Sequence, residues 1–433
     1  MSASTPTAAI TPPTFASTPA SAEDGDPAFN IVRWLAGYLA FWIIMSIGFA
    51  MVSQVLLPQR IKDMGAANPT AVLGTMTAVG SIVALVANII IGALSDLTKS
   101  RFGKRTPWLF WGAWFSLGFY LLMGNIGVII GLTITLWLSK IGFNMMNSPI
   151  YSTVSDRVPK RYRGTISSAI GFGNTLGLAI GAFVGAYFVE SVRLGFTIAA
   201  ICMFASAMLF LVIIPREPGN KDEATEIKEG SVFKHVVYSF TPPIKGASDF
   251  WKAFCCRTFL LLGIQMLSGY WLYIGQDYLG LDKSDAAHVV SMIAVFQMIA
   301  SIVAMIVGPL SDRIHRRKPM VVLAACLAII GFIFPIAMHS ITGMYLAACF
   351  VALGNGIFMS IDQALNVDVL PSKENAGKDL GFINAATTAG QSAGMALTSA
   401  IVTATGTYTY IFPIAIVMSV LSIISVLLIK SVK

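Results

Sequence analysis

The 433-residue chain is 56% hydrophobic and only 12% charged, with a mean hydropathy of +0.75. Soluble domains carry about 25% charged residues, so this composition argues against a soluble enzyme, and also against a nucleic-acid partner despite the net charge of +8. A membrane-spanning helix needs about 20 apolar residues, so twelve spans would need about 240. The composition therefore predicts an all-α polytopic membrane protein.

In chain order, residues 1–29 form a tail rich in Ser, Thr, Ala and Pro without a basic leader, which predicts disorder and no cleaved signal peptide. Six spans are expected within 30–214, a connector at 215–256, and six more spans within 257–433. The apolar runs lie at about 31–57, 70–94, 107–124, 126–150, 165–189, 195–214, 257–279, 287–310, 319–337, 343–366, 380–404 and 409–430.

The basic residues predict the orientation. With both termini cytoplasmic, 24 Lys and Arg residues fall in inner segments and only four in outer ones. The outer four are Arg60, Lys62, Arg193 and Lys283. Because cytoplasmic loops are enriched in basic residues, this bias predicts a multi-pass protein of the cell membrane with both termini inside.

The two predicted halves repeat each other. GALSD, ending at Asp96, recurs as GPLSD, ending at Asp312, 216 positions later. Pro159 of SDRVP and Pro371 of NVDVLP lie 212 positions apart in corresponding loops. Two echoes at nearly equal offsets predict an internal duplication, with two pseudo-symmetric six-helix bundles and a site between them near the bilayer midplane.

The loop after the second span carries the most specific motif, Gly92-Ala-Leu-Ser-Asp96 followed by Arg101-Phe-Gly-Lys104-Arg105. It resembles the signature loop of the major facilitator superfamily, and its longer form resembles that of the glycoside and sucrose proton symporters. The resemblance implies a conformational latch formed by Gly92, Asp96, Arg101, Lys104, Arg105, Asp312, Arg313 and Arg317. The alternative is that these charges only set topology. Leu97 departs from the family's basic residue, which implies a weaker latch in the first half.

Polar stripes inside the spans predict a binding surface. Trp137, Lys140, Asn144 and Asn147 share one face of the fourth span, and the seventh, tenth and eleventh spans carry similar faces. In the superfamily, spans 1, 4, 7 and 10 line a central cavity. The predicted substrate contacts are Tyr38, Trp137, Lys140, Asn144, Asn147, Gln265, Tyr273, Gln276, Asn355, Asn384 and Gln391. Amides and aromatic rings suit a sugar, although such amides also join helices through hydrogen bonds.

Ionisable groups within spans are costly and usually functional, so Asp277 and Asp362 are the candidate proton carriers. An interfacial helix end for Asp277 and a fixed pairing for Asp362 are the structural alternatives. No hydrolase, ATP-binding or metal motif is present, which predicts a non-enzymatic protein without a cofactor. Sodium-coupled melibiose-type symporters carry acids in the second and fourth spans, whereas this chain has Lys140 in the fourth, so a proton is the expected coupling ion.

The sequence thus predicts a proton-coupled secondary transporter of a glycoside or oligosaccharide that works by alternating access. Its expected partners are a small-molecule substrate, the proton and membrane lipids. An exporter of drugs or organic anions from the same superfamily is the first alternative, since Lys140 would bind an anion. A membrane sensor that has lost turnover is the second, and the short connector and tail argue against it.

Overall fold

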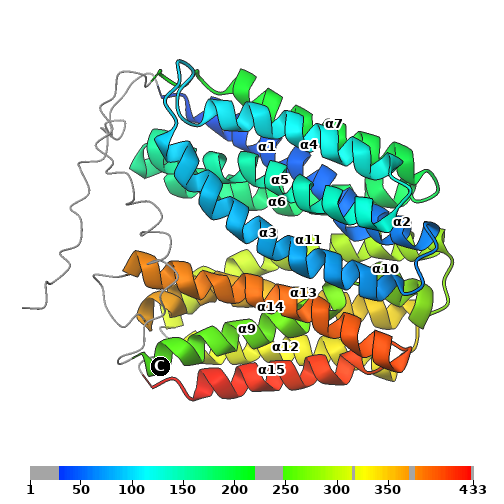
Figure 1. The fold of residues 1–433 in the computed structure, drawn as a ribbon. Helices are drawn as coiled ribbons and strands as arrows, with labels where there is room; N and C mark the ends of the chain where they lie inside the picture. Colours follow the sequence, from blue (N-terminus) through cyan, green and yellow to red (C-terminus); the bar gives the residue numbers. More distant parts are fainter. Residues whose placement is uncertain (1–28, 220–246, 315–316, 370–375, 431–433) are drawn as a thin grey trace, which may run out of the picture.

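The computed structural model describes residues 29–219, 247–314, 317–369 and 376–430, and within these ranges every regular element is helical (Figure 1). The predicted tail up to residue 28 and residues 220–246 of the predicted connector lie outside this part. The helices form the two bundles that the duplication predicted, so the all-α, two-bundle fold is confirmed.

The first bundle contains α1 (Ile31–Ala50), α3 (Pro69–Leu97), α4 (Thr106–Asn125), α5 (Ile129–Arg157), α6 (Lys160–Tyr187) and α7 (Val192–Ile213). The π-helical segment η1 (Met51–Leu56) and α2 (Leu57–Asp63) extend α1. Pro58 has no N–H to donate to the carbonyl four residues earlier, and the irregular helix lies just before it. α1 and α6 pack closely, because a Cβ on Gly181 would lie 2.5 Å from the Ile47 carbonyl oxygen.

The second bundle repeats this plan with α9 (Ser248–Ser268), α11 (Lys283–Ile314), α12 (Arg317–Ala337), α13 (Ile341–Asp368), α14 (Ala376–Thr405) and α15 (Ile411–Leu427). The short α10 (Trp271–Tyr273) and the π-helical η2 (Ile274–Tyr278) extend α9, as η1 and α2 extend α1. The close glycine contact also recurs, since a Cβ on Gly394 of α14 would lie 2.5 Å from the Leu262 carbonyl oxygen of α9. This equivalence of α1–α6 and α9–α14 is the structural form of the sequence repeat.

Length and apolar composition mark eight helices of the described chain as able to cross a membrane, and α15 is a shorter apolar helix. α9 begins at Ser248 and not at the predicted start, Arg257. The aromatic side chains of Phe250, Trp251 and Phe254 pack against Phe382 of α14 and lengthen this helix. Arg257 therefore lies inside α9.

The bundles lie side by side, with α3 packed on α14 and α6 on α11 at their interface (Figure 1). We call the end with loops 64–68, 188–191 and 279–282 the closed end, on the right in Figure 1. The end with loops 98–105, 158–159 and 214–219 is the basic end. The hydrogen bonds and ion pairs that join described residues of one bundle to those of the other all involve the closed end.

Candidate functional site

Lys140 is the charged group of the α5 stripe. It lies about 17 Å along a helix of about 44 Å, measured from Ile129, so it is near the middle of the span. Its ammonium lies 4.8 Å from the centre of the Phe49 ring of α1. No carboxylate among the described residues forms an ion pair with it. Lys140 is thus a cation within the span that has an aromatic ring as its neighbour and no described carboxylate as an ionic partner.

The other members of the stripe divide into two kinds. Asn144 is buried, accepts a hydrogen bond from Asn88 of α3 at 3.1 Å and donates one to the Lys140 carbonyl oxygen at 2.8 Å. Trp137 donates through Nε1 to the Met76 carbonyl oxygen of α3 at 3.0 Å. In contrast, the buried Oδ1 of Asn147 has no hydrogen-bond partner. Asn144 and Trp137 thus join α5 to α3, whereas Lys140 and Asn147 keep free polar atoms.

The aromatic residues facing this stripe differ from the predicted one. Tyr38 is fully buried in the first bundle, where its ring packs edge-on against Phe210 of α7, so it has no surface for a substrate in this conformation. Trp42 contacts Tyr151 with ring centres 5.1 Å apart, and Phe49 contacts Phe143 at 5.5 Å. Trp42 and Phe49 lie four and eleven positions after Tyr38, so all three share one face of α1. The Tyr38 hydroxyl donates to the Ile150 carbonyl oxygen of α5 at 3.4 Å, so the predicted face of α1 is the one that meets α5.

The second bundle holds a buried ion pair. Arg257 Nη1 of α9 lies 2.8 Å from Asp362 Oδ2 of α13, and both side chains are less than 5% exposed. Asn366 donates to the same carboxylate oxygen at 2.9 Å, and Arg257 Nε donates to Thr387 Oγ1 of α14 at 2.8 Å. The sequence analysis placed Arg257 at the edge of the connector and missed it. A carboxylate inside a span needs a nearby cation, so Asp362 was the signal that could have identified Arg257 as its partner.

The remaining predicted contacts in this bundle are scattered. The Oδ1 atom of Asn355 in α13 is buried without a hydrogen-bond partner, as in Asn147. Gln265 is partly buried beside Gly394 of α14, and Gln391 is exposed. Asn384 lies in α14, with its side chain outside the described part.

Three predicted residues instead join the two bundles at the closed end. Tyr273 donates to the Pro58 carbonyl oxygen at 2.8 Å, and Gln276 donates to Gln59 Oε1 at 2.9 Å. Asp277 forms an ion pair with Lys62, whose ammonium lies 4.9 Å from the centre of the Tyr273 ring. We call these six residues the clasp. Asp277 is 41% exposed, so it occupies the interfacial helix end that was the structural alternative to a buried proton carrier.

The clasp has neighbours of similar chemistry. Thr70 and Tyr408 share a hydrogen bond of 2.6 Å, and Asn68 donates to Thr403 at 3.0 Å, so α3 is joined to the α14 side. Lys283 and Glu190 form an ion pair of 2.6 Å between the start of α11 and the loop before α7. Each contact is polar, so water could replace it.

At the basic end, Arg105 organises the motif loop. Its buried guanidinium forms ion pairs with Asp96 and with Asp156 of α5, the latter at 2.9 Å, and donates to Ser95 at 2.6 Å. Glu217, after α7, accepts hydrogen bonds from the Arg105 and Thr106 backbone N–H groups at 2.9 and 3.0 Å. The loop thus ties α3, α4, α5 and the residues after α7 together, and the sequence analysis missed both Asp156 and Glu217.

The other predicted latch residues are placed as follows. Gly92 faces Ser148 of α5, where an added Cβ would lie 3.1 Å from the hydroxyl oxygen. Arg101 lies 4.6 Å from the centre of the Phe102 ring, and Lys104 lies in the same loop. Asp312 and Arg313 lie in α11 with side chains outside the described part, and Arg317 begins α12.

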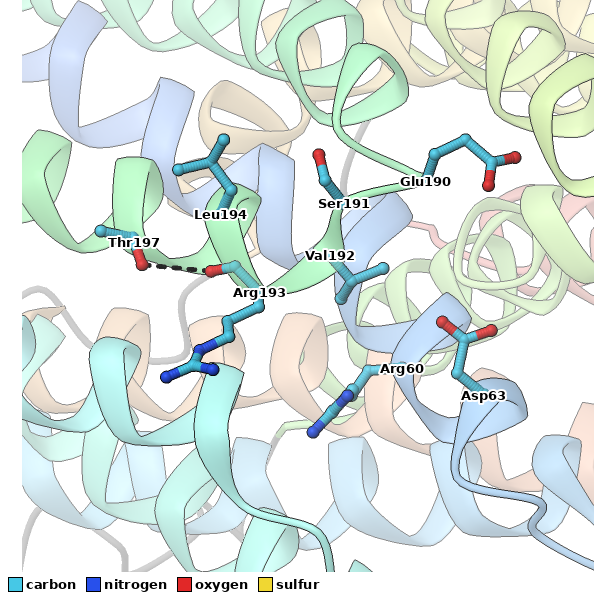
Figure 2. A pocket seen from close by; sticks show the side chains of 8 residues that line it. All are labelled: Arg60, Asp63, Glu190, Ser191, Val192, Arg193, Leu194 and Thr197. Atoms are coloured by element: carbon cyan, nitrogen blue, oxygen red, sulfur yellow. Dashed lines mark hydrogen bonds between the residues drawn. The ribbon is translucent and has the colours of Figure 1, made fainter.

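Two hollows accompany these features. One, of about 500 Å³, lies at the closed end between α2, the loop before α7 and α7 itself (Figure 2). The other, of about 190 Å³, lies between α6 and α11 and is lined by Ser168, Phe172, Thr175 and Met298 among others. Neither contains Lys140 or Asp362, so the candidate site is defined by its free polar groups and not by either hollow.

Solved structures share this fold. The chain resembles a mutant of the nucleoside transporter NupG with a TM-score of 0.73 and 11% identity, covering 92% of this chain and 99% of that one. It resembles a mutant of the peptide transporter POT bound to alafosfalin with a TM-score of 0.70 and 15% identity, covering 93% and 96%. The human organic anion transporter MFSD10 gives 0.62 and 12%, covering 92% and 99%. No curated protein sequence matches the chain.

Identities this low establish the fold and leave the substrate open. The family model described as Major Facilitator Superfamily matches residues 31–370 and 253–433, which together span both bundles. With the two-bundle fold, the repeated motif loops and a polar site within the spans, the chain belongs to the major facilitator superfamily of membrane transporters.

Proposed function

We propose that this chain is a proton-coupled importer of a glycoside or oligosaccharide, working by alternating access in the cell membrane. The observation that carries the proposal is the set of uncommitted polar groups inside the spans, Lys140, Asn147 and Asn355, in a fold whose bundles are bonded to each other at one end. By the positive-inside rule the basic end and both termini are cytoplasmic, so this conformation is closed to the outside.

Sugar chemistry fits these groups. Asn147 and Asn355 each offer a free amide oxygen to a hydroxyl donor, and the partly buried rings of Phe49 and Phe143 give flat apolar surfaces at the α1–α5 contact. An unsatisfied buried amide oxygen costs about 1–3 kcal/mol, so a hydroxyl that donates to it gains that interaction on binding. A transported ligand is a simple reason for two such atoms in facing bundles.

Asp362 is the preferred proton site. In the deprotonated state its carboxylate holds Arg257, and through Arg257 it joins α13 to α9 and α14. Protonation would remove the attraction and free Arg257 to move with α9. Asp277 is the second candidate, because protonation there would break the ion pair with Lys62 in the clasp. The two sites would thus act on different steps, one within a bundle and one between the bundles.

Uptake into proteoliposomes tests the proposal. With an inward proton gradient, at least one member of a broad panel of glycosides and oligosaccharides should accumulate, and collapse of the gradient with a protonophore should stop accumulation. A parallel sodium gradient at equal pH should not replace the proton gradient. If neither a proton gradient nor exchange moves any sugar in the panel, the sugar-symport proposal is wrong.

An organic-anion transporter is the second candidate, and one observation favours it. Lys140 has no carboxylate partner in the described structure, so an anionic group of a substrate would satisfy it. Lys140→Gln distinguishes the two. Loss of anion transport with neutral sugar transport unchanged would favour the anion transporter. An equal loss on neutral sugars would place Lys140 in the sugar site.

A further inference from the structure

The hollow at the closed end is outside the proposed transport site and has a distinct composition (Figure 2). It combines charged and apolar residues at the junction of α2 and α7. Its lining residues are Arg60, Asp63, Glu190, Ser191, Val192, Arg193, Leu194 and Thr197. Leu194 is 51% exposed, so the rim of the hollow presents an apolar side chain at the bundle surface.

The positive charges at this end are few, and their partners differ. Of the four basic residues in the predicted outer segments, Lys62 pairs with Asp277 and Lys283 pairs with Glu190. The other two, Arg60 and Arg193, both line the hollow, and neither forms an ion pair with a described carboxylate. Since outer segments are depleted of basic residues, the presence of two unpaired arginines in one hollow indicates a binding role for them.

The carboxylates of the same wall are already engaged elsewhere. Glu190 binds Lys283 at 2.6 Å, and Asp63 accepts a hydrogen bond from Gln59 at 2.8 Å. Glu190 and Asp63 both act on Lys283. The hydrogen bond to Glu190 raises the pKa of the Lys283 ammonium, burial lowers it, and the charges of Glu190 and Asp63 raise it further, so that the pKa is raised overall. In Figure 2 the carboxylates of Asp63 and Glu190 lie toward one side, and both guanidinium groups extend toward the other.

Hydrogen bonds to the end of α4 account for only some of the N–H donors of Arg60 and Arg193. Arg60 Nη2 donates to the Ile126 carbonyl oxygen, just after α4, at 2.9 Å. Its Nε is buried and has no hydrogen-bond partner, an arrangement that costs free energy unless a ligand supplies an acceptor. The Arg193 backbone also lies near this helix end, since its carbonyl oxygen would be 3.4 Å from a Cβ on Gly124. Its guanidinium has no such capping bond to a described residue.

We propose that this hollow binds the phosphate of an anionic phospholipid of the outer leaflet. Two guanidinium groups with free N–H donors match phosphate oxygens, and the exposed Leu194 side chain, which lines the hollow on the other side of the start of α7, suits the first part of an acyl chain. The proposal rests on the orientation given under the proposed function, and on no assumption about substrate or proton coupling. Because Glu190 belongs both to the wall and to the pair with Lys283 across the bundles, the lipid would lie next to a contact that breaks on opening.

Native mass spectrometry of the full-length protein tests the site. The protein is titrated with phosphatidylglycerol or phosphatidylcholine, and retention of each lipid is measured for wild type and variants. Wild type should retain phosphatidylglycerol more tightly than phosphatidylcholine. Arg193→Gln should weaken phosphatidylglycerol binding about tenfold, which is the loss of one charge-assisted contact of about 1.4 kcal/mol.

The matched control is Lys62→Gln, which removes the same charge at the same end from a residue whose partner, Asp277, does not line the hollow. It should keep phosphatidylglycerol binding within about twofold of wild type. Arg60→Lys retains the charge and tests the guanidinium shape, and it should bind more weakly than wild type. A competition arm uses inorganic phosphate, which should not displace the lipid at millimolar concentration.

The outcomes separate clearly. Equal binding by wild type and Arg193→Gln, or an equal loss in Lys62→Gln, would overturn the proposal. Displacement of the lipid by inorganic phosphate alone would assign the hollow to a soluble anion and would also overturn it. Failure of sugar uptake would not affect this measurement, so the two proposals can fail independently.

Discussion

The two bundles differ in whether a charged side chain inside the membrane has an ionic partner. In the second, Arg257 and Asp362 neutralise each other, and Asn366 and Thr387 occupy further hydrogen-bonding positions. In the first, Lys140 has the Phe49 ring as its neighbour and no ion pair with a described carboxylate. A duplicated fold therefore holds one site whose charges are paired, the complete site, and one whose charge has no described ionic partner, the incomplete site. The difference suggests that the second bundle handles the proton and the first binds the group that the substrate brings.

The largest effect should come from unbalancing the complete site. Asp362→Asn leaves the Arg257 charge buried and unpaired, which should destabilise the protein by about 3–5 kcal/mol and abolish proton-driven uptake. Thermal unfolding in detergent and uptake into proteoliposomes measure the two effects. The double variant Arg257→Gln with Asp362→Asn should recover most of the stability and none of the proton dependence. Full stability in the single variant would show that the pair is not structural.

A smaller effect is expected at the incomplete site. Lys140→Gln removes a charge that no described carboxylate balances, so the unfolding temperature should stay the same or rise. Uptake should fall at least tenfold for the transported ligand, because a buried charge or hydrogen bond to it is lost. Lys252→Gln is the matched control, since it removes a lysine charge from a pair with Asp249 within α9, away from the α5 stripe and the clasp. A strong loss of stability in Lys140→Gln would mean that Lys140 is a structural residue and would remove the contrast between the bundles.

The two-bundle fold could be predicted from the sequence, but several contacts of the candidate site could not. Both outcomes have physical reasons. Span composition and the GALSD repeat determine the bundles, because lipid forces backbone polar groups into helices. A polar stripe identifies the face of α5 but not its partners, so Asn88 and Trp42 were missed. Periodicity leaves the direction of Tyr38 open, because the neighbouring α7 also buries aromatic side chains.

The seventh span shows a different limit. Regular helical spacing grouped Gln265, Tyr273 and Gln276 on one face, but α9 ends at Ser268 and η2 has a wider helical period. The helix break and the π-helix turn Tyr273, Gln276 and Asp277 toward α2 and its Pro58 carbonyl. Irregular backbone of this kind is not encoded in hydrophobic periodicity. Tyr273 and Gln276 were therefore predicted as substrate contacts and Asp277 as a proton carrier, and all three are found in the clasp.

The smallest expected effect concerns the clasp, whose contacts are partly exposed. Lys62→Gln with Asp277→Asn removes an ion pair in which Asp277 is 41% exposed, and such pairs contribute at most about 1 kcal/mol. That amount changes a two-state equilibrium about fivefold, so the population of the conformation open at this end should rise by about that factor. Spin labels on the α2–α3 and η2–α11 loops would report it as a shift toward longer distances. Lys252→Gln, which breaks the Asp249 pair within α9, is the matched control and should leave the distances unchanged. An unchanged distribution in the clasp variant would mean that the hydrogen bonds from Tyr273 and Gln276 hold this end without the charges.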